Sequence, residues 1–118
     1  MNLRRFEMRK AHSYTPQTTA LTSLLGLEIA RARRTRRWNQ KELAQRAGIS
    51  ALTLSSIERG STKVAIGTVF EVAHLVGLDL LGAQADDLPE LLSRSHDRLA
   101  LLPVRVRNRQ SDENDDNF

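Results

Sequence analysis

Apolar residues recur every three or four positions along most of this chain, which is the spacing of amphipathic helices. Over residues 66–76, for example, Val69, Val72, Ala73 and Val76 share one face of a helix. The pattern predicts an all-α fold, a compact bundle of about five helices with flexible tails. The predicted helices span about 22–36, 40–47, 51–59, 66–76 and 88–101.

Residues with strong capping preferences mark where these helices begin and end. Thr22 or Ser23 is the expected N-cap of the first helix, and Ser50 that of the third. Asn39 followed by Glu42 predicts a capping box at the start of the second helix. Glycine adopts a left-handed backbone without steric cost, so helix ends are expected at Gly48, Gly60 and Gly77.

The helices at 40–47 and 51–59 are joined by a very short turn. Ala44 is small where the two helices would cross, and Gly48 supplies the left-handed conformation that the turn needs. With five apolar contact positions, this is the pattern of a helix-turn-helix, whose second helix enters a DNA major groove. The apolar positions are Leu43, Ala47, Ile49, Leu54 and Ile57.

The segment at 78–84, LDLLGAQ, is too short for a helix and roughly alternates, which predicts a short strand. An unpaired exposed strand promotes aggregation, and the sequence offers no second strand to pair with it. We therefore expect a homodimer in which this strand pairs with its copy. The expected dimerisation residues are Leu78, Leu80 and Leu81.

Charge divides the 118 residues into two halves. Residues 1–60 carry 12 Lys/Arg and 4 Asp/Glu, whereas residues 61–118 carry 6 and 10. A basic half that contains the helix-turn-helix pattern suits a polyanion such as DNA. The acidic half would be repelled by phosphate, so it is expected to have another role.

Composition excludes several classes of function. The chain has no cysteine, and His12, His74 and His96 lie far apart, so no metal site and no thiol chemistry are expected. No signal peptide or membrane span is evident, which predicts a soluble cytoplasmic protein. No catalytic motif is present, so we expect neither an enzyme nor a cofactor.

Residues 21–80 resemble the Cro/lambda-repressor type of helix-turn-helix domain, also called XRE. The matching segments are RARR, NQKELAQRAGIS, LSSIERG and TVFEVAHLVGLDL. Arg37 departs from the family pattern, because a glycine often ends the first helix there. Ala51 and Leu52 also depart from it, because these recognition positions are polar in many relatives. The expected organisation is an extension at 1–19, a DNA-binding domain with its strand at 20–84, a helix at 85–103 and an acidic flexible tail at 104–118.

The resemblance assigns structural roles to some residues. In the family, the positions of Arg33 and Glu58 form an internal ion pair between the first and third helices. A glutamine at the position of Gln40 bonds a DNA phosphate there and can brace the recognition helix. Trp38 replaces a leucine and is expected to pack in the core. The expected phosphate contacts are Gln40, Lys41, Thr53, Ser55, Arg59, Lys63, Arg36 and Arg37.

The start of the third helix and its next turn are expected to contact DNA bases. None of these positions holds Arg, Gln or Asn, so the bidentate recognition of G or A is not available. Serine can bond several bases, and Ala or Leu can pack on a thymine methyl; DNA shape, water and nearby arginines are expected to add to this readout. A contact with the second helix is the alternative role of Leu52. The expected base contacts are Ser50, Ala51, Leu52 and Ser56.

The segment GLDLLGAQ and the tail LLPVRVR…DDNF resemble the HipB-type antitoxins. Those proteins pair with HipA-type serine/threonine kinase toxins and repress their own operon. The resemblance implies a homodimer on a near-palindromic double-stranded DNA site, with such a kinase bound through Asp115, Asp116 and Phe118. A stand-alone dimeric repressor of the phage or metabolic type is one alternative. A protein-interaction module that has lost DNA binding is another.

Overall fold

The computed structural model describes residues 13–105, which contain five α-helices and no strand. The chain divides into two units at Leu80–Leu81. The expected all-α fold is confirmed, but only four of the five helices belong to the bundle that carries the helix-turn-helix. None of the described helices has the length and apolar character needed to span a membrane. The first unit holds α2 (Pro16–Thr35), α3 (Gln40–Ala47), α4 (Ala51–Glu58) and α5 (Ile66–Leu75), and the second holds α6 (Leu88–Ala100).

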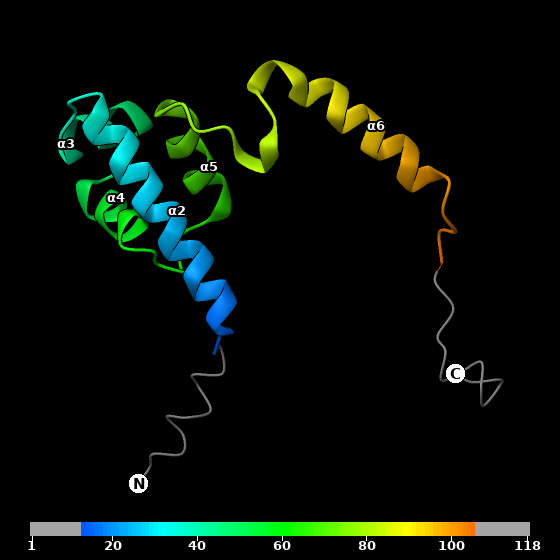
Figure 1. The fold of residues 1–118 in the computed structure, drawn as a ribbon, viewed down its shortest axis with the longest axis horizontal. Helices are drawn as coiled ribbons and strands as arrows, with labels where there is room; N and C mark the ends of the chain where they lie inside the picture. The colour runs from blue at the N-terminus through cyan, green and yellow to red at the C-terminus, as the bar shows by residue number, and fades with distance from the viewer. Residues whose placement is uncertain (1–12, 106–118) are drawn as a thin grey trace, which may run out of the picture. The chain divides into compact units, whose positions relative to one another are not determined.

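The core of the first unit takes one fully buried large side chain from each of its four helices. These are Ile29, Leu43, Leu54 and Val72, and burying each contributes about 1.5–3 kcal/mol. The short helices α3, α4 and α5 gather beside the C-terminal part of α2, and its N-terminal part extends beyond them (Figure 1). Leu21, in the N-terminal part of α2, is accordingly 65% exposed.

Helix α2 begins at Pro16, six residues before the expected start. The Thr15 side chain accepts a hydrogen bond from the Thr18 backbone N–H, and Pro16 occupies the first turn, where its missing N–H costs nothing. The predicted cap, Thr22, lies within the helix and donates to the Thr19 carbonyl instead. Residues 13–15 therefore remain of the expected 1–19 extension, and residues 1–12 lie outside the described part of the chain.

The expected strand at 78–84 is absent. Leu80–Gly82 forms a 3-10 turn, and Leu81 has a left-handed φ of 58°, which a strand does not accommodate. A strand needs a neighbour to satisfy its backbone groups, and residues 13–105 of this chain provide none. A second short 3-10 helix, Ala85–Asp87, leads into α6.

All four helices of the first unit end in the same way. In each, two backbone N–H groups beyond the end bond back to carbonyls three and five residues earlier, which is the Schellman motif. Glycine holds the left-handed position after α3, α4 and α5, as predicted, with φ of 72° at Gly48. After α2 the same position is Arg37, with φ of 60°. Here the family's usual glycine is missing, and the arginine itself adopts the strained conformation.

Gly26 allows α2 and α4 to touch through their backbones. A Cβ atom at this position would lie 2.5 Å from the Ile57 carbonyl oxygen and 2.6 Å from that of Glu58. Both atoms belong to backbone and cannot rotate away. The close approach brings the C-terminal half of α4 against α2, which positions the helix-turn-helix on its scaffold.

The left-handed conformation of Arg37 predicts that glycine is better there for stability. Arg37→Gly should raise the free energy of unfolding by about 0.5–1 kcal/mol, because relief of the left-handed strain outweighs the added freedom of the unfolded chain. Urea unfolding measures this. Gly48→Ala is the matched control, since a Cβ there meets no atom within 4 Å and only the strain changes, lowering stability by about 1 kcal/mol. Destabilisation by Arg37→Gly would contradict the account.

Candidate nucleic-acid interface

Helix α4 presents one face to the core and the other to solvent. Leu54, Ile57 and Glu58 are buried, so helical periodicity puts Leu52 and Ser56 on the opposite face. Leu52 is 74% exposed. The outward face therefore carries apolar and hydroxyl groups. Ala51 and Arg59 are also exposed, whereas Ser55 and Ser56 are half-buried.

The first turn of α4 is held by Ser50. Its hydroxyl oxygen accepts a hydrogen bond of 3.0 Å from the Thr53 backbone N–H and lies 3.0 Å from the Thr53 hydroxyl. Ser50 is exposed and Thr53 half-buried. Ser50 therefore has a structural role whether or not it also contacts a base.

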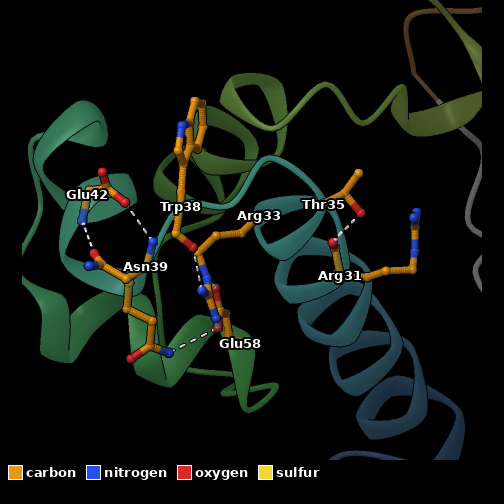
Figure 2. A network of polar contacts seen from close by, with 8 residues as sticks. Arg31, Arg33, Thr35, Trp38, Asn39, Glu42 and Glu58 are labelled. Atoms are coloured by element: carbon orange, nitrogen blue, oxygen red, sulfur yellow. Dashed lines mark hydrogen bonds and ion pairs between the residues drawn. The ribbon is translucent and has the colours of Figure 1, made fainter.

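A buried network joins α2, α3 and α4. Arg33 donates from Nε to Glu58 Oε2 at 2.7 Å and from Nη2 to Glu58 Oε1 at 2.9 Å, and its Nη1 donates to the Trp38 carbonyl at 2.8 Å. Gln40 Nε2 donates to Glu58 Oε1 at 3.0 Å. Figure 2 shows the arginine reaching from α2 to Glu58 on α4. Arg33 and Glu58 are 6% and 9% exposed, so the two charges compensate each other away from water.

The network sets the charge state of both partners. Burial acts to raise the pKa of Glu58, but hydrogen bonds from Arg33 and Gln40 and the charges of Arg33 and Arg34 outweigh it, so this pKa lies below its ordinary value. The hydrogen bond to Glu58 raises the pKa of Arg33, against the effect of burial. The pair is therefore fully ionised at neutral pH.

Gln40 is the first residue of α3 and turns its side chain inward. One hydrogen of its side-chain amide bonds Glu58, so this residue braces α4. The same amide group has a second hydrogen that can be donated. Around it, Asn39 and Glu42 form the expected capping box through two bonds of 2.8 Å. The start of α3 is thus fixed by both a cap and the buried network.

The basic candidates fall into two groups. Lys41, Lys63 and Arg37 are exposed, and Arg59 is exposed while donating from Nη1 to Ser55 Oγ at 2.7 Å. Arg36 is also exposed, but its guanidinium lies 5.6 Å from the centre of the Trp38 ring and close to the Gly77 backbone.

Trp38 packs partly against the core, as expected. Its ring also carries the guanidinium of Arg46 at 4.2 Å, a cation–π contact that sequence reasoning did not predict. Gly26 was missed as well, because a glycine in a helical pattern gives no sign of what packs on it. A tryptophan between arginines is a signal that could have indicated the stacking.

Comparison with known proteins agrees with this geometry. A helix-turn-helix family model matches residues 29–82. A curated relative, the uncharacterized HTH-type transcriptional regulator y4dJ of Sinorhizobium fredii (strain NBRC 101917 / NGR234), is 36% identical over 58 residues, which are 49% of this chain and 75% of that protein.

The fold and this site define a DNA-binding transcriptional regulator of the helix-turn-helix class. The chain belongs to the XRE-type helix-turn-helix family. The match ends at residue 82, so it does not include α6. The candidate toxin contacts Asp115, Asp116 and Phe118 lie outside the described residues. Within residues 13–105, no three His, Cys, Asp or Glu side chains are grouped to hold a metal ion.

The buried pair makes a prediction about Glu58. Glu58→Gln should lower the free energy of unfolding at pH 7 by about 3 kcal/mol, because it leaves the Arg33 charge buried without its counterion. Folding lowers the pKa of Glu58 below its value in the unfolded chain, which is about 4.3. The ionised carboxylate therefore contributes its full stabilisation of the fold above that unfolded-state pKa. This contribution is lost as the pH falls through the folded-state pKa. The difference between variant and parent should therefore shrink below about pH 4.

Denaturant unfolding at pH 7 and at pH 3.5 measures both effects. Glu28→Gln is the matched control, since Glu28 pairs with Arg31 at 2.8 Å on the surface, and it should cost no more than about 0.5 kcal/mol. Equal effects of the two variants at pH 7 would show that the buried pair does not organise the fold.

Proposed function

We propose that this protein is a sequence-specific transcriptional repressor that binds DNA as a homodimer, with α4 of each copy in the major groove. The observation that carries the proposal is the outward face of α4, which is exposed at Leu52 while the opposite face is fixed to α2 and α3. A rigid helix with a free face is what major-groove readout requires. In a two-fold dimer the two recognition helices would lie about 34 Å apart on a near-palindromic site.

The chemistry of that face indicates how bases are read. Ala51 and Leu52 suit thymine methyl groups, and Ser56 can bond several bases. None of the exposed positions in the first two turns holds a charged or amide side chain. Direct readout is therefore modest, and sequence-dependent DNA shape contributes a large share of the specificity.

Exposed cations around α4 suit the DNA backbone. Lys41 follows the N-terminus of α3, Arg59 ends α4, and Lys63 lies in the following loop. The first backbone N–H groups of α3 have no partner within the helix and suit a phosphate oxygen. Such contacts fix the register of the protein on DNA without carrying sequence information. Arg36 is a weaker candidate than Arg37, because it packs on Trp38.

Variants of α4 and α3 should separate specific from general binding. Leu52→Ala and Ser56→Ala should each weaken binding to DNA from upstream of the protein's own gene by about five- to fiftyfold, because a base contact is lost, and leave binding to random DNA unchanged. Lys41→Ala should weaken both similarly and reduce the slope of log affinity against log salt by about one. Quantitative gel shifts at several salt concentrations measure these effects.

Leu27→Ala is the matched control for Leu52→Ala, because Leu27 is 63% exposed on α2. It should leave both affinities unchanged. Ser50→Ala is a poor test, since it also removes the cap of α4. If Leu52→Ala and Ser56→Ala left the preference for the operator intact, α4 would not be the reader.

We further propose that the protein is the antitoxin of a HipA-type kinase and represses the operon that encodes both. The support is the sequence of the tail, LLPVRVR…DDNF, since the strand that also suggested this family is absent. Four acids and the aromatic Phe118 suit a basic protein surface with an apolar pocket better than DNA. A stand-alone repressor of the phage or metabolic type remains the alternative if no kinase is encoded nearby.

Deleting residues 112–118 tests the antitoxin proposal. The truncated protein should bind the kinase encoded beside it at least about tenfold more weakly, because the acids and Phe118 are lost. Its DNA affinity should be unchanged or slightly higher, because negative charge is removed. Calorimetry with the purified kinase and gel shifts measure the two quantities. Equal kinase affinity with and without the tail would overturn the role of these residues.

A further inference from the structure

Helix α6 carries a continuous leucine stripe that its own unit does not bury. Leu88, Leu92, Leu99 and Leu102 are 48–66% exposed, and Leu91 is half-buried. At 100° per residue, Leu88, Leu91, Leu92 and Leu99 fall within a face about 100° wide, and Leu102 follows just beyond the end of the helix. All residues of α6 except Leu91 are exposed, and most of those outside the stripe are polar or charged. The helix therefore has one apolar face and one polar face. Such a face is stable in water only when another surface covers it.

Four of the five leucines are placed symmetrically about Ser95. Leu88 and Leu102 lie seven residues before and after it, and Leu91 and Leu99 lie four before and after. If a second copy of the helix packed antiparallel in full register, each of these four leucines would lie beside a leucine, and Leu92 would lie beside the aliphatic part of Arg98. The small Ser95 would lie at the crossing point, where it lets the two helices approach closely.

Charge selects the orientation. Asp86, Asp87 and Glu90 make the N-terminal end acidic, whereas at the C-terminal end Arg98 and Arg105 outnumber Asp97 and leave it net basic. A parallel pair would bring the three acids of each copy together. An antiparallel pair places the acidic end of one helix beside the basic end of the other, twice by symmetry.

We propose that the leucine face of α6 is the dimerisation surface of this protein, and that its occupant is α6 of a second copy, packed antiparallel. The inference deepens the proposed function, on whose homodimer it rests. It also replaces the contact first expected at 78–84: Leu78 and Leu80 pack against the core of the first unit, so only Leu81, at 95% exposure, was available there.

The size of the contact sets its strength. The 13 residues of α6 span about 20 Å, so the pair is smaller than a standard protein interface. The dimer is therefore expected to dissociate on dilution, and binding to two DNA half-sites would strengthen it by raising the effective concentration.

Sedimentation of the full chain without DNA tests the surface independently of DNA binding. The protein should be dimeric at high micromolar concentration, and Leu92→Glu/Leu99→Glu should raise the dimer dissociation constant by at least about 100-fold. Leu101→Glu is the matched control: Leu101 is 84% exposed at the end of the same helix but lies off the stripe, and the dissociation constant should not change. Circular dichroism establishes that each variant is folded.

The absence of cysteine allows the orientation to be tested by crosslinking. Chains carrying Leu88→Cys should be joined to chains carrying Leu102→Cys by a short thiol crosslinker when the two are mixed, and neither should crosslink with itself. Self-crosslinking of each variant alone would overturn the antiparallel arrangement. A monomeric parent, or a dimer unaffected by Leu92→Glu/Leu99→Glu, would overturn the surface itself, and intact operator binding in that case would leave the reading role of α4 standing.

Discussion

The ion pair between Arg33 and Glu58 is the interaction on which the DNA-binding unit depends. It joins the end of α2 to the end of α4, and Gln40 adds the start of α3 to the same carboxylate. Two buried charges are stable only when each satisfies the other's hydrogen bonds, so the geometry of the three helices is closely constrained. This network holds α4 from behind and leaves its outward face free, which is the condition for reading DNA.

That rigidity compensates for a weak set of reading side chains. Leu52 and the hydroxyls of α4 cannot form the bidentate hydrogen bonds that distinguish guanine or adenine. A helix with such a face must be positioned accurately, because apolar contact with a thymine methyl is short in range. The backbone contact at Gly26 and the cap at Ser50 serve the same requirement. In the proposed complex, exposed cations at the edges supply affinity, and the shape of the DNA adds specificity.

Features encoded by local rules could be predicted from the sequence. The capping box of Asn39 and Glu42 and the left-handed glycine at Gly48 depend on a few neighbouring residues, and the structure has both. Helix α2 starts earlier than predicted, because a threonine before a proline is also a good helix start. The strand was predicted from the roughly alternating pattern at 78–84, but a strand also needs a neighbour, which residues 13–105 do not supply. Contacts between distant segments, such as Gly26 with Ile57, leave no local pattern.

The central claim is that two copies of α4 read one DNA site from the major groove. Chemical protection with dimethyl sulfate tests this directly, because the reagent methylates guanine N7 in the major groove and adenine N3 in the minor groove. The account predicts protection of guanine N7 in two patches about one helical turn apart, with adenine N3 unprotected. Protection confined to adenine N3, or a single patch on saturated DNA, would contradict it.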